Sequence, residues 1–248
     1  MGKTGTAYKR PEKAYGNTRV KASRQTLKPS GAKKSREVMT KSPMEWYQDL
    51  KTSLLRRYPD ESIKTIMFAS TKSGVGASTT AINFATALAK DSEFKVLMVE
   101  VNLRTPSLHK TYRIDKTLGM AVLFSNGDKM APPIKKVGPD NLYVLQCDRK
   151  QSNPLGLFES NHFNHFLKIA RKKFDYVILD APPILSFPES LILCAEVDGV
   201  VLVVEAGKTR RQVAVRAKKE VEEAGGRLLG QILNKRDYYI PEWVYRWL

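Results

Sequence analysis

Apolar stretches of two kinds alternate along the chain after residue 64. Short continuous apolar runs predict buried strands, whereas apolar residues that recur every three or four positions predict helices packed on them. This alternation predicts an α/β fold, in which a mainly parallel sheet carries helices on both faces. The expected strands are 65–69, 95–101, 142–145, 176–180, 200–204 and 228–233, and the expected helices are 79–90, 157–173, 188–196 and 209–224.

One further helix is predicted ahead of the first strand. Pro43 suits the first turn of a helix, and apolar residues follow it at spacings of three and four up to Leu55. The most apolar run, 199–204, is far shorter than the roughly 18 to 20 residues that cross a bilayer. We therefore expect one folded domain that does not span a membrane.

The positive charge of the chain is concentrated in its first segment. The 248 residues carry a net charge of +17; residues 1–43 hold twelve Lys and Arg residues against Glu12 and Glu37, which leaves +7 for the rest. This segment is rich in Gly, Ser, Thr and Pro, so we expect a disordered basic arm. The arm would bind an anionic membrane surface or an acidic partner, or stay a solvated tail. Its basic residues are spread out, and nucleic acid is the least expected partner.

The composition excludes several classes of protein. A hydrophobic fraction of 42% is that of a globular protein rather than a wholly disordered one. The two cysteines, Cys147 and Cys194, are too few for a disulfide framework or a zinc cluster. We expect a reducing, cytoplasmic setting.

A glycine-rich loop joins the first expected strand to the helix 79–90. Its glycines let successive backbone N–H groups point at a phosphate, and the helix N-terminus favours negative charge. Ser78 stands where a hydroxyl usually binds Mg²⁺, but the lysine expected just before it is replaced by Ala77. The residues expected to bind phosphate are Ser73, Gly74, Val75, Gly76, Ala77, Ser78 and Thr79.

Four further segments carry a resemblance to a known family. Residues 96–109 resemble a strand that ends in a second Walker motif, Asp-x-Asp-x-Arg followed by Pro, and residues 176–185 resemble a Walker B strand with a trailing Pro-Pro. Residues 230–234 resemble the closing strand, and residues 45–51 resemble a degraded Glu-x-x-Arg-x-x-Arg ring-forming helix. The chain resembles the bacterial tyrosine kinases of the capsular and exopolysaccharide family, a branch of the ParA/MinD-like deviant Walker ATPases.

The resemblance implies ATP or ADP with Mg²⁺ as the cofactor, bound in a P-loop NTPase domain. It places Glu100 and Asn102 at the two acidic positions of the catalytic motif. Lys72 occupies the position of the extra lysine of the deviant Walker branch and would supply charge within its own site or across a dimer. The residues implied as Mg²⁺ ligands are Ser78, Glu100 and Asp180, and the residue implied near the adenine is Asn234.

The departures from the family pattern are concentrated at the positions that act in phosphoryl transfer. The family uses Asp at both positions that are Glu100 and Asn102 here, and Asn cannot act as a base. Phosphoryl transfer depends on cations placed against developing charge, and Ala77 supplies none. An engineered change at Ala77 would leave the other two departures unexplained. The pattern favours a pseudokinase that binds nucleotide weakly, as a regulatory subunit of exopolysaccharide or capsule biosynthesis and export.

Two other functions stay open at this point. The first is a working tyrosine autokinase of the same system that uses Lys72 and Glu100 in place of the usual groups. The second is a ParA/MinD-like partition ATPase, which the basic arm favours and the Pro-Pro segment after Asp180 disfavours.

The division of the chain follows from these patterns: a basic arm at 1–43, a nucleotide-binding domain at 44–236 and a Tyr/Trp-rich tail at 237–248. The resemblance implies that tail tyrosines accept phosphate from a neighbouring subunit, but the apolar tail also suits a segment that docks on a partner, a membrane surface or its own core. The phosphoacceptor candidates are Tyr238, Tyr239 and Tyr245.

The resemblance also implies partners at the inner face of the cell membrane. These are the cytoplasmic part of a membrane polysaccharide co-polymerase or another kinase-like subunit. A homo-oligomer is a further alternative, although Gln48 and Lys51 replace two arginines of the ring-forming motif.

Overall fold

The structure is a computed structural model in which the chain separates into two units, residues 1–40 and 41–248. It describes residues 43–59, 63–90, 94–115, 119–125, 132–138, 141–148 and 154–236, all in the second unit. The expected basic arm, apart from Pro43, and the expected tail lie outside the described residues. The domain boundaries expected from the sequence therefore stay predictions.

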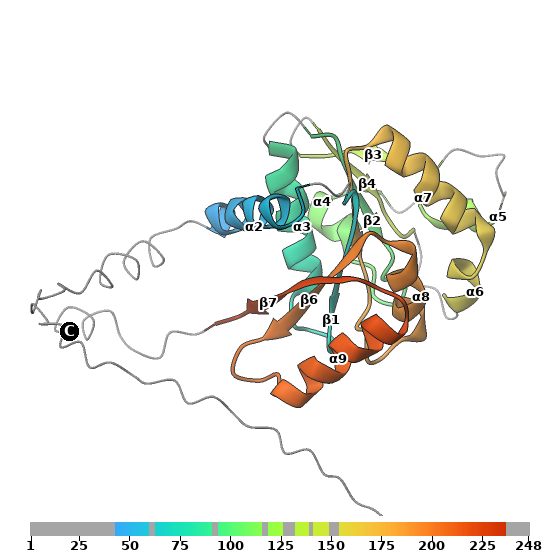
Figure 1. Ribbon diagram of the computed structural model, residues 1–248. Coiled ribbons are helices and arrows are strands. Elements are labelled where there is room, and N and C mark those ends of the chain that lie inside the picture. Colours follow the sequence, from blue (N-terminus) through green and yellow to red (C-terminus); the bar gives the residue numbers. More distant parts are fainter. Residues whose placement is uncertain are drawn as a thin grey trace, which may run out of the picture. The chain divides into compact units, whose positions relative to one another are not determined.

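A mostly parallel sheet forms the centre of the second unit, and the predicted fold class is confirmed (Figure 1). Among the described residues its strand order is β3-β4-β2-β5-β1-β6-β7, and only the edge pair β3–β4 is antiparallel. The six expected strands are all present, with bounds within one residue of those expected, and the short strand Lys135–Lys136 was not expected. Their bounds are β1 Thr65–Ser70, β2 Val96–Glu100, β3 Lys135–Lys136, β4 Leu142–Leu145, β5 Tyr176–Asp180, β6 Gly199–Glu205 and β7 Leu228–Asn234.

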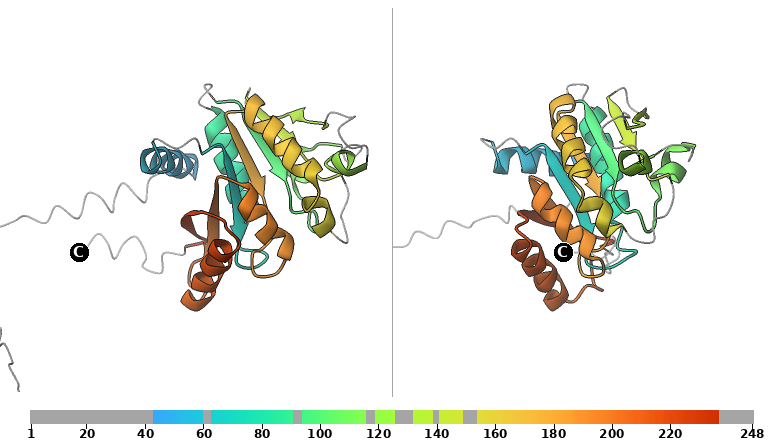
Figure 2. Two further views of the ribbon diagram at one scale, coloured as in Figure 1. Left: turned by 45° about the vertical axis from the view of Figure 1, so that its right-hand side comes forward. Right: turned by 90° about the vertical axis from the view of Figure 1, so that its right-hand side faces the viewer.

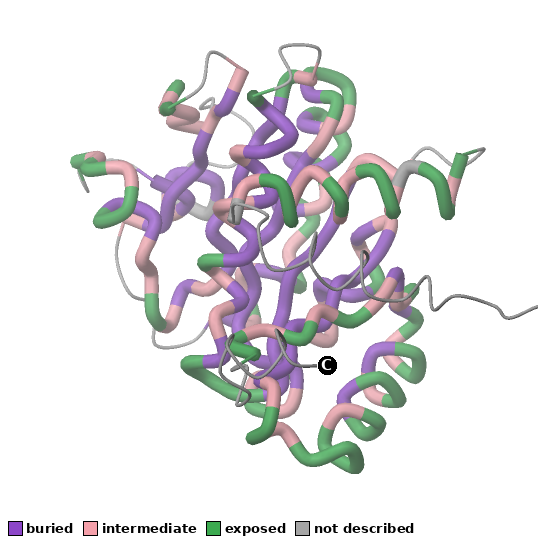
Figure 3. The backbone as a smooth tube through the Cα atoms, turned by 90° about the vertical axis from the view of Figure 1, so that its left-hand side faces the viewer, coloured by how far each residue is buried: buried purple, intermediate pink, exposed green. Residues whose placement is uncertain are grey.

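Helices cover both faces of this sheet (Figure 2). Successive strand residues face opposite sides, so Ile66 and Phe68 pack in one core while Met67 and Ala69 pack in the other. β1, β2 and β6 are buried along their whole length, and the central strands are purple in Figure 3. The first core is covered by α2 (Pro43–Arg57), α3 (Ala77–Lys90) and α4 (Leu108–Tyr112), and the second by α5 (Ala121–Ser125), α6 (Leu155–Phe158), α7 (Asn161–Lys173), α8 (Pro188–Glu196) and α9 (Arg211–Glu223).

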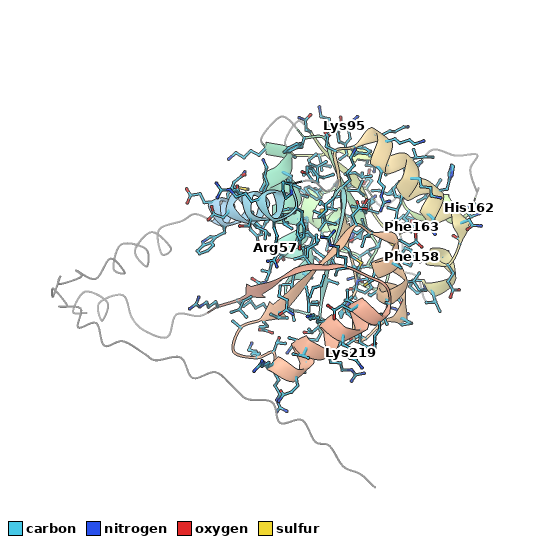
Figure 4. The ribbon with its side chains drawn as sticks, viewed as in Figure 1. Arg57, Lys95, Phe158, His162, Phe163 and Lys219 are labelled. Carbon is cyan, nitrogen blue, oxygen red and sulfur yellow. The ribbon has the colours of Figure 1, made fainter. Side chains whose placement is uncertain are left out.

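The helix expected over 157–173 is in fact two helices, α6 and α7. Ser160 has extended backbone angles (φ −74°, ψ 145°), so the chain leaves one helix and starts the next there. The turn brings the Phe158 and Phe163 rings together edge-on, with centroids 5.0 Å apart (Figure 4). This aromatic contact places the break between α6 and α7 against the core. His162, which precedes Phe163 on α7, is exposed.

The carboxyl ends of the parallel strands meet at one edge of the sheet, where α/β proteins bind ligands. Glu100 at the end of β2 is in register with Asp180 at the end of β5, and Glu205 of β6 is in register with Asn234 of β7. The glycine-rich loop leaves β1 between these two pairs. Among the described helices, none is both long and apolar enough to cross a membrane.

Candidate functional site

The glycine-rich loop between β1 and α3 has the backbone shape that its sequence predicts. Gly74 and Gly76 adopt φ of +79° and +101°, a left-handed conformation that favours glycine. Val75 between them is fully buried and anchors the loop in the core. Thr80 closes the first turn of α3, because its N–H and its hydroxyl both donate to the Gly76 carbonyl, at 3.0 and 2.9 Å. A loop of this kind, continuous with a helix N-terminus, can bind a phosphate.

Asp180 supplies a buried carboxylate beside this loop. The residue is 1% exposed, and neither oxygen has a hydrogen-bond partner among the described residues. Burial raises the pKa of this carboxyl to about 7; the nearby Ser78 hydroxyl opposes the rise, and the negative charge of Glu100 adds to it. An unpartnered carboxylate next to a hydroxyl fits the hard oxygen ligands that Mg²⁺ takes.

A magnesium ion here would need ligands beyond the protein. Within the described ranges, no group of three His, Cys, Asp or Glu side chains is placed to hold a metal ion. Mg²⁺ usually keeps several waters and binds through one or two carboxylates together with substrate phosphates. The pair of Asp180 and Ser78 therefore fits a metal that arrives with a nucleotide.

Glu100 lies beside Asp180 in the sheet but has quite different contacts. Its Oε1 accepts the backbone N–H groups of Ser107 and Leu108, the latter at 2.8 Å, at the start of α4. Its Oε2 accepts the N–H of Cys147, at 2.9 Å, just after β4. Glu100 is thus a clamp that ties the end of β2 to two loops, and its expected roles as a catalytic residue and Mg²⁺ ligand stay predictions. The sequence did not reveal this clamp, because α4 was not expected.

Asn102 is likewise engaged within its own loop. Its Oδ1 accepts hydrogen bonds from the N–H and the hydroxyl of Thr105, at 3.3 and 3.1 Å. Its own N–H and that of Val101 donate to the Asp180 carbonyl, at 2.9 and 3.0 Å. The loop after β2 is therefore attached to the end of β5, and the Asn102 side chain shapes the turn.

Arg104 and Glu189 form a pair that sequence reasoning missed. The Arg104 Nε donates to Glu189 Oε1 at 2.5 Å, and the guanidinium stacks 4.6 Å from the centre of the Phe187 ring. Glu189 is fully buried in the first turn of α8, so this ion pair joins the loop after β2 to the segment after β5. Arg104 is the arginine of the motif at residues 96–109, but nothing in the sequence points to its partner 85 residues away.

Asn234 contacts the glycine-rich loop itself. Its Nδ2 donates to the Val75 carbonyl at 2.8 Å, and Gly76 approaches the same side chain so closely that a Cβ there would overlap it. The structure thus places Asn234 at the loop that was expected to bind phosphate. The Nζ of Lys72, the candidate for extra charge, lies 3.8 Å from Oε2 of Glu205. The tyrosines of the tail lie outside the described residues.

Comparisons with known proteins match this chain to one protein family, to tyrosine kinases and to a solved structure with the same fold. Residues 63–212 match a family described as an AAA domain. The tyrosine-protein kinase YwqD of Bacillus subtilis (strain 168) is 32% identical over 190 residues, 77% of this chain and 80% of that protein. The tyrosine-protein kinase CpsD of Streptococcus agalactiae is 29% identical over 196 residues, 79% of this chain and 84% of that protein. The crystal structure of the chimerical protein CapA2B2 superposes with a TM-score of 0.73 at 27% identity, over 80% of this chain and 87% of that one.

Proposed function

The chain belongs to the family of bacterial tyrosine kinases, and we propose that it is a nucleotide-binding regulatory subunit of exopolysaccharide or capsule biosynthesis and export whose phosphoryl transfer is weak or absent. The observation that carries the proposal is Ala77. It is the first residue of α3 and nearly buried, at the position where the family's P-loop has a lysine.

The missing lysine affects transfer more than binding. A charge-assisted hydrogen bond to a phosphate contributes about 1.5 to 3 kcal/mol, and more where charge develops in the transition state. Glu100 adds to this loss, because both of its carboxylate oxygens already accept backbone N–H groups. Donors of this kind stabilise the charged carboxylate and so make it a weaker general base. These two features support a weakened kinase.

The groups that hold a nucleotide are retained. The backbone N–H groups of the loop would bind the phosphates, while Ser78 and Asp180 would hold Mg²⁺. When bound, the ion supplies positive charge to the phosphate oxygens. Asn234 keeps the loop in shape through Val75.

Purified full-length protein tests the proposal in two measurements. We expect saturable binding of Mg·ADP by calorimetry and no phosphotyrosine after incubation with Mg·ATP. Robust phosphotyrosine labelling would show an active autokinase instead, and absence of Mg·ADP binding would overturn the nucleotide-binding role. The matched comparison is Ala77→Lys, which restores the family's residue: a large gain in labelling would show that the lysine alone was missing.

The partner proposed is the cytoplasmic part of a membrane polysaccharide co-polymerase or another kinase-like subunit. Two contacts of α2 support a mixed assembly over a ring of identical chains. Gln48 donates to the Ala87 carbonyl at 3.1 Å, and the Lys51 ammonium lies 5.0 Å from the centre of the Phe94 ring. Both replace ring-forming arginines and contact their own domain. A single monomeric peak in size exclusion, with nucleotide and candidate partner present, would count against this assembly.

Residues 1–43 are proposed to hold the protein at an anionic membrane surface. Their excess positive charge supports this role. We expect sedimentation with vesicles that contain phosphatidylserine, and loss of sedimentation in high salt or after deletion of the segment. Unchanged sedimentation of the deletion variant would overturn the proposal.

A further inference from the structure

A cluster of lysines surrounds one buried carboxylate beside the glycine-rich loop. Glu205, at the end of β6, has a side chain only 6% exposed. Among the described residues, its oxygens lie 2.9 Å from the Nζ of Lys208, 3.5 Å from that of Lys235 and 3.8 Å from that of Lys72. One negative charge therefore faces three positive charges, and these lysines lower the pKa of the Glu205 carboxyl. The cluster has a net positive charge next to a site built for phosphate.

Lys235 is the member of the cluster that donates to a loop carbonyl from a different element, the end of β7. Its Nζ donates to the Gly74 carbonyl at 2.6 Å, 161 residues away in the sequence. Lys72, by contrast, has a described contact with Glu205 at 3.8 Å and a half-exposed side chain. A lysine from the end of β7 thus stands at the rim of a phosphate-binding loop that has Ala77 at the position of the family's lysine.

The backbone at the end of β7 makes this placement possible. Consecutive strand residues point to opposite faces, so Asn234 and Lys235 would ordinarily diverge. Lys235 instead has φ of +53°, a left-handed conformation uncommon outside glycine. Both side chains then contact neighbouring carbonyls of the loop, Val75 and Gly74. Uncommon backbone conformations of this kind cluster at functional sites.

The geometry points to Lys235 as the residue that supplies the nucleotide's phosphates with the positive charge that Ala77 does not. The assignment rests on the proposed nucleotide binding. A lysine side chain is a flexible stem with a compact charge, so its Nζ can move from the Gly74 carbonyl to a phosphate oxygen without a change in the backbone. Glu205 acts as a positioning residue, because it holds the ammonium at the loop.

The test compares variants of the full chain by calorimetry with ADP and with adenosine, which lacks phosphates. For Lys235→Met we expect roughly tenfold to a hundredfold weaker ADP binding and unchanged adenosine binding. Lys235→Arg keeps the charge and should keep most of the ADP affinity. Lys219→Met removes an equal charge from an exposed site on α9, where the lysine pairs with Glu223, and should change neither affinity.

The outcomes separate this assignment from the proposed function. If the parent protein binds no ADP, the proposed function fails as well. If the parent binds ADP and Lys235→Met binds it equally well, only the assignment of Lys235 is overturned. An equal loss for ADP and adenosine would also overturn it, because Lys235 would then only support the loop.

A double variant tests whether Lys235 and a lysine at position 77 share one role. We expect Ala77→Lys to restore ADP affinity in the Lys235→Met background and to add much less to the parent. The same gain in both backgrounds would overturn the assignment, because the two positions would then act independently. Thermal unfolding of each variant checks that the fold is retained.

Discussion

Glu100 and Asp180 are neighbouring buried carboxylates with opposite surroundings. They lie in register at the ends of adjacent strands, and both are 1% exposed or less. Glu100 accepts three backbone N–H groups from two loops. Asp180 accepts none among the described residues, and its pKa is raised to about 7.

The difference distinguishes a carboxylate that is satisfied within the fold from one that has no such partners. A buried charge without partners costs stability, so its presence indicates that something outside the chain pairs with it. A buried charge with three donors is satisfied and stabilises the loops that supply them. The contacts of Glu100 are therefore those of a framework residue, whereas Asp180 is the carboxylate that we propose for a metal and nucleotide.

The largest effect should come from removing the satisfied carboxylate. Glu100→Ala leaves three N–H groups without an acceptor, and each such buried donor costs about 1 to 3 kcal/mol. We expect the free energy of unfolding, measured in urea, to fall by about 4 kcal/mol or more. Glu100→Gln is the matched variant: its carbonyl can keep two acceptor contacts while its amide faces the third N–H, so it should lose about half as much. Equal losses, or losses below about 1 kcal/mol for both, would contradict the clamp.

The next effect concerns a third buried carboxylate, which is paired with a charge. Arg104→Ala leaves Glu189 buried and alone, and breaking a buried pair costs about 3 to 5 kcal/mol. Because the Arg104 side chain is 28% exposed, we expect the lower end, about 3 kcal/mol, in urea unfolding. The double variant Arg104→Ala with Glu189→Gln should recover part of the loss. No recovery would mean that the Phe187 contact, rather than the charge pair, is what Arg104 contributes.

Asp180→Asn should act in the opposite direction. The substitution removes an unpartnered buried charge, so without nucleotide or metal we expect the free energy of unfolding to rise by about 1 to 2 kcal/mol at pH 8. The parent should gain stability from Mg·ADP by about 2.7 kcal/mol at a hundredfold excess over Kd, and the variant should gain much less. A variant that is destabilised without ligand would show that Asp180 is a framework carboxylate like Glu100.

The strands and most helices of this fold follow from local pattern. Continuous apolar runs predict β1, β5 and β6 because both faces of these strands are covered by helices. Pro188 marks the start of α8 at its observed position. The two-residue strand β3 and the short helix α4 leave no such pattern, since neither is long enough to show a period.

The site was predictable in its location but not in its contacts. The glycine-rich loop and Asp180 stand out because the loop follows β1 and Asp180 ends β5, and both strands end at the same edge of the sheet. The acceptor role of Glu100 and the contact of Lys235 with Gly74 join residues 47 and 161 positions apart. Such contacts depend on strand order and on the backbone turn after β7, and neither is visible in local sequence.

Asn102→Asp should have the smallest effect on stability, and it adds a third acidic residue beside Glu100 and Asp180. The Asn102 Oδ1 accepts two hydrogen bonds from Thr105, and an aspartate oxygen accepts both equally well, so we expect a change within about 0.5 kcal/mol. Asn102→Ala removes the acceptor and should cost about 1 kcal/mol in the same urea titration. The aspartate also restores the family's acidic residue two positions beyond the end of β2. If Asn102→Asp with Ala77→Lys gains phosphotyrosine labelling over Ala77→Lys alone, the acidic position limits transfer in this chain. If it gains none, the limit lies in Glu100, whose oxygens stay bound to the two loops.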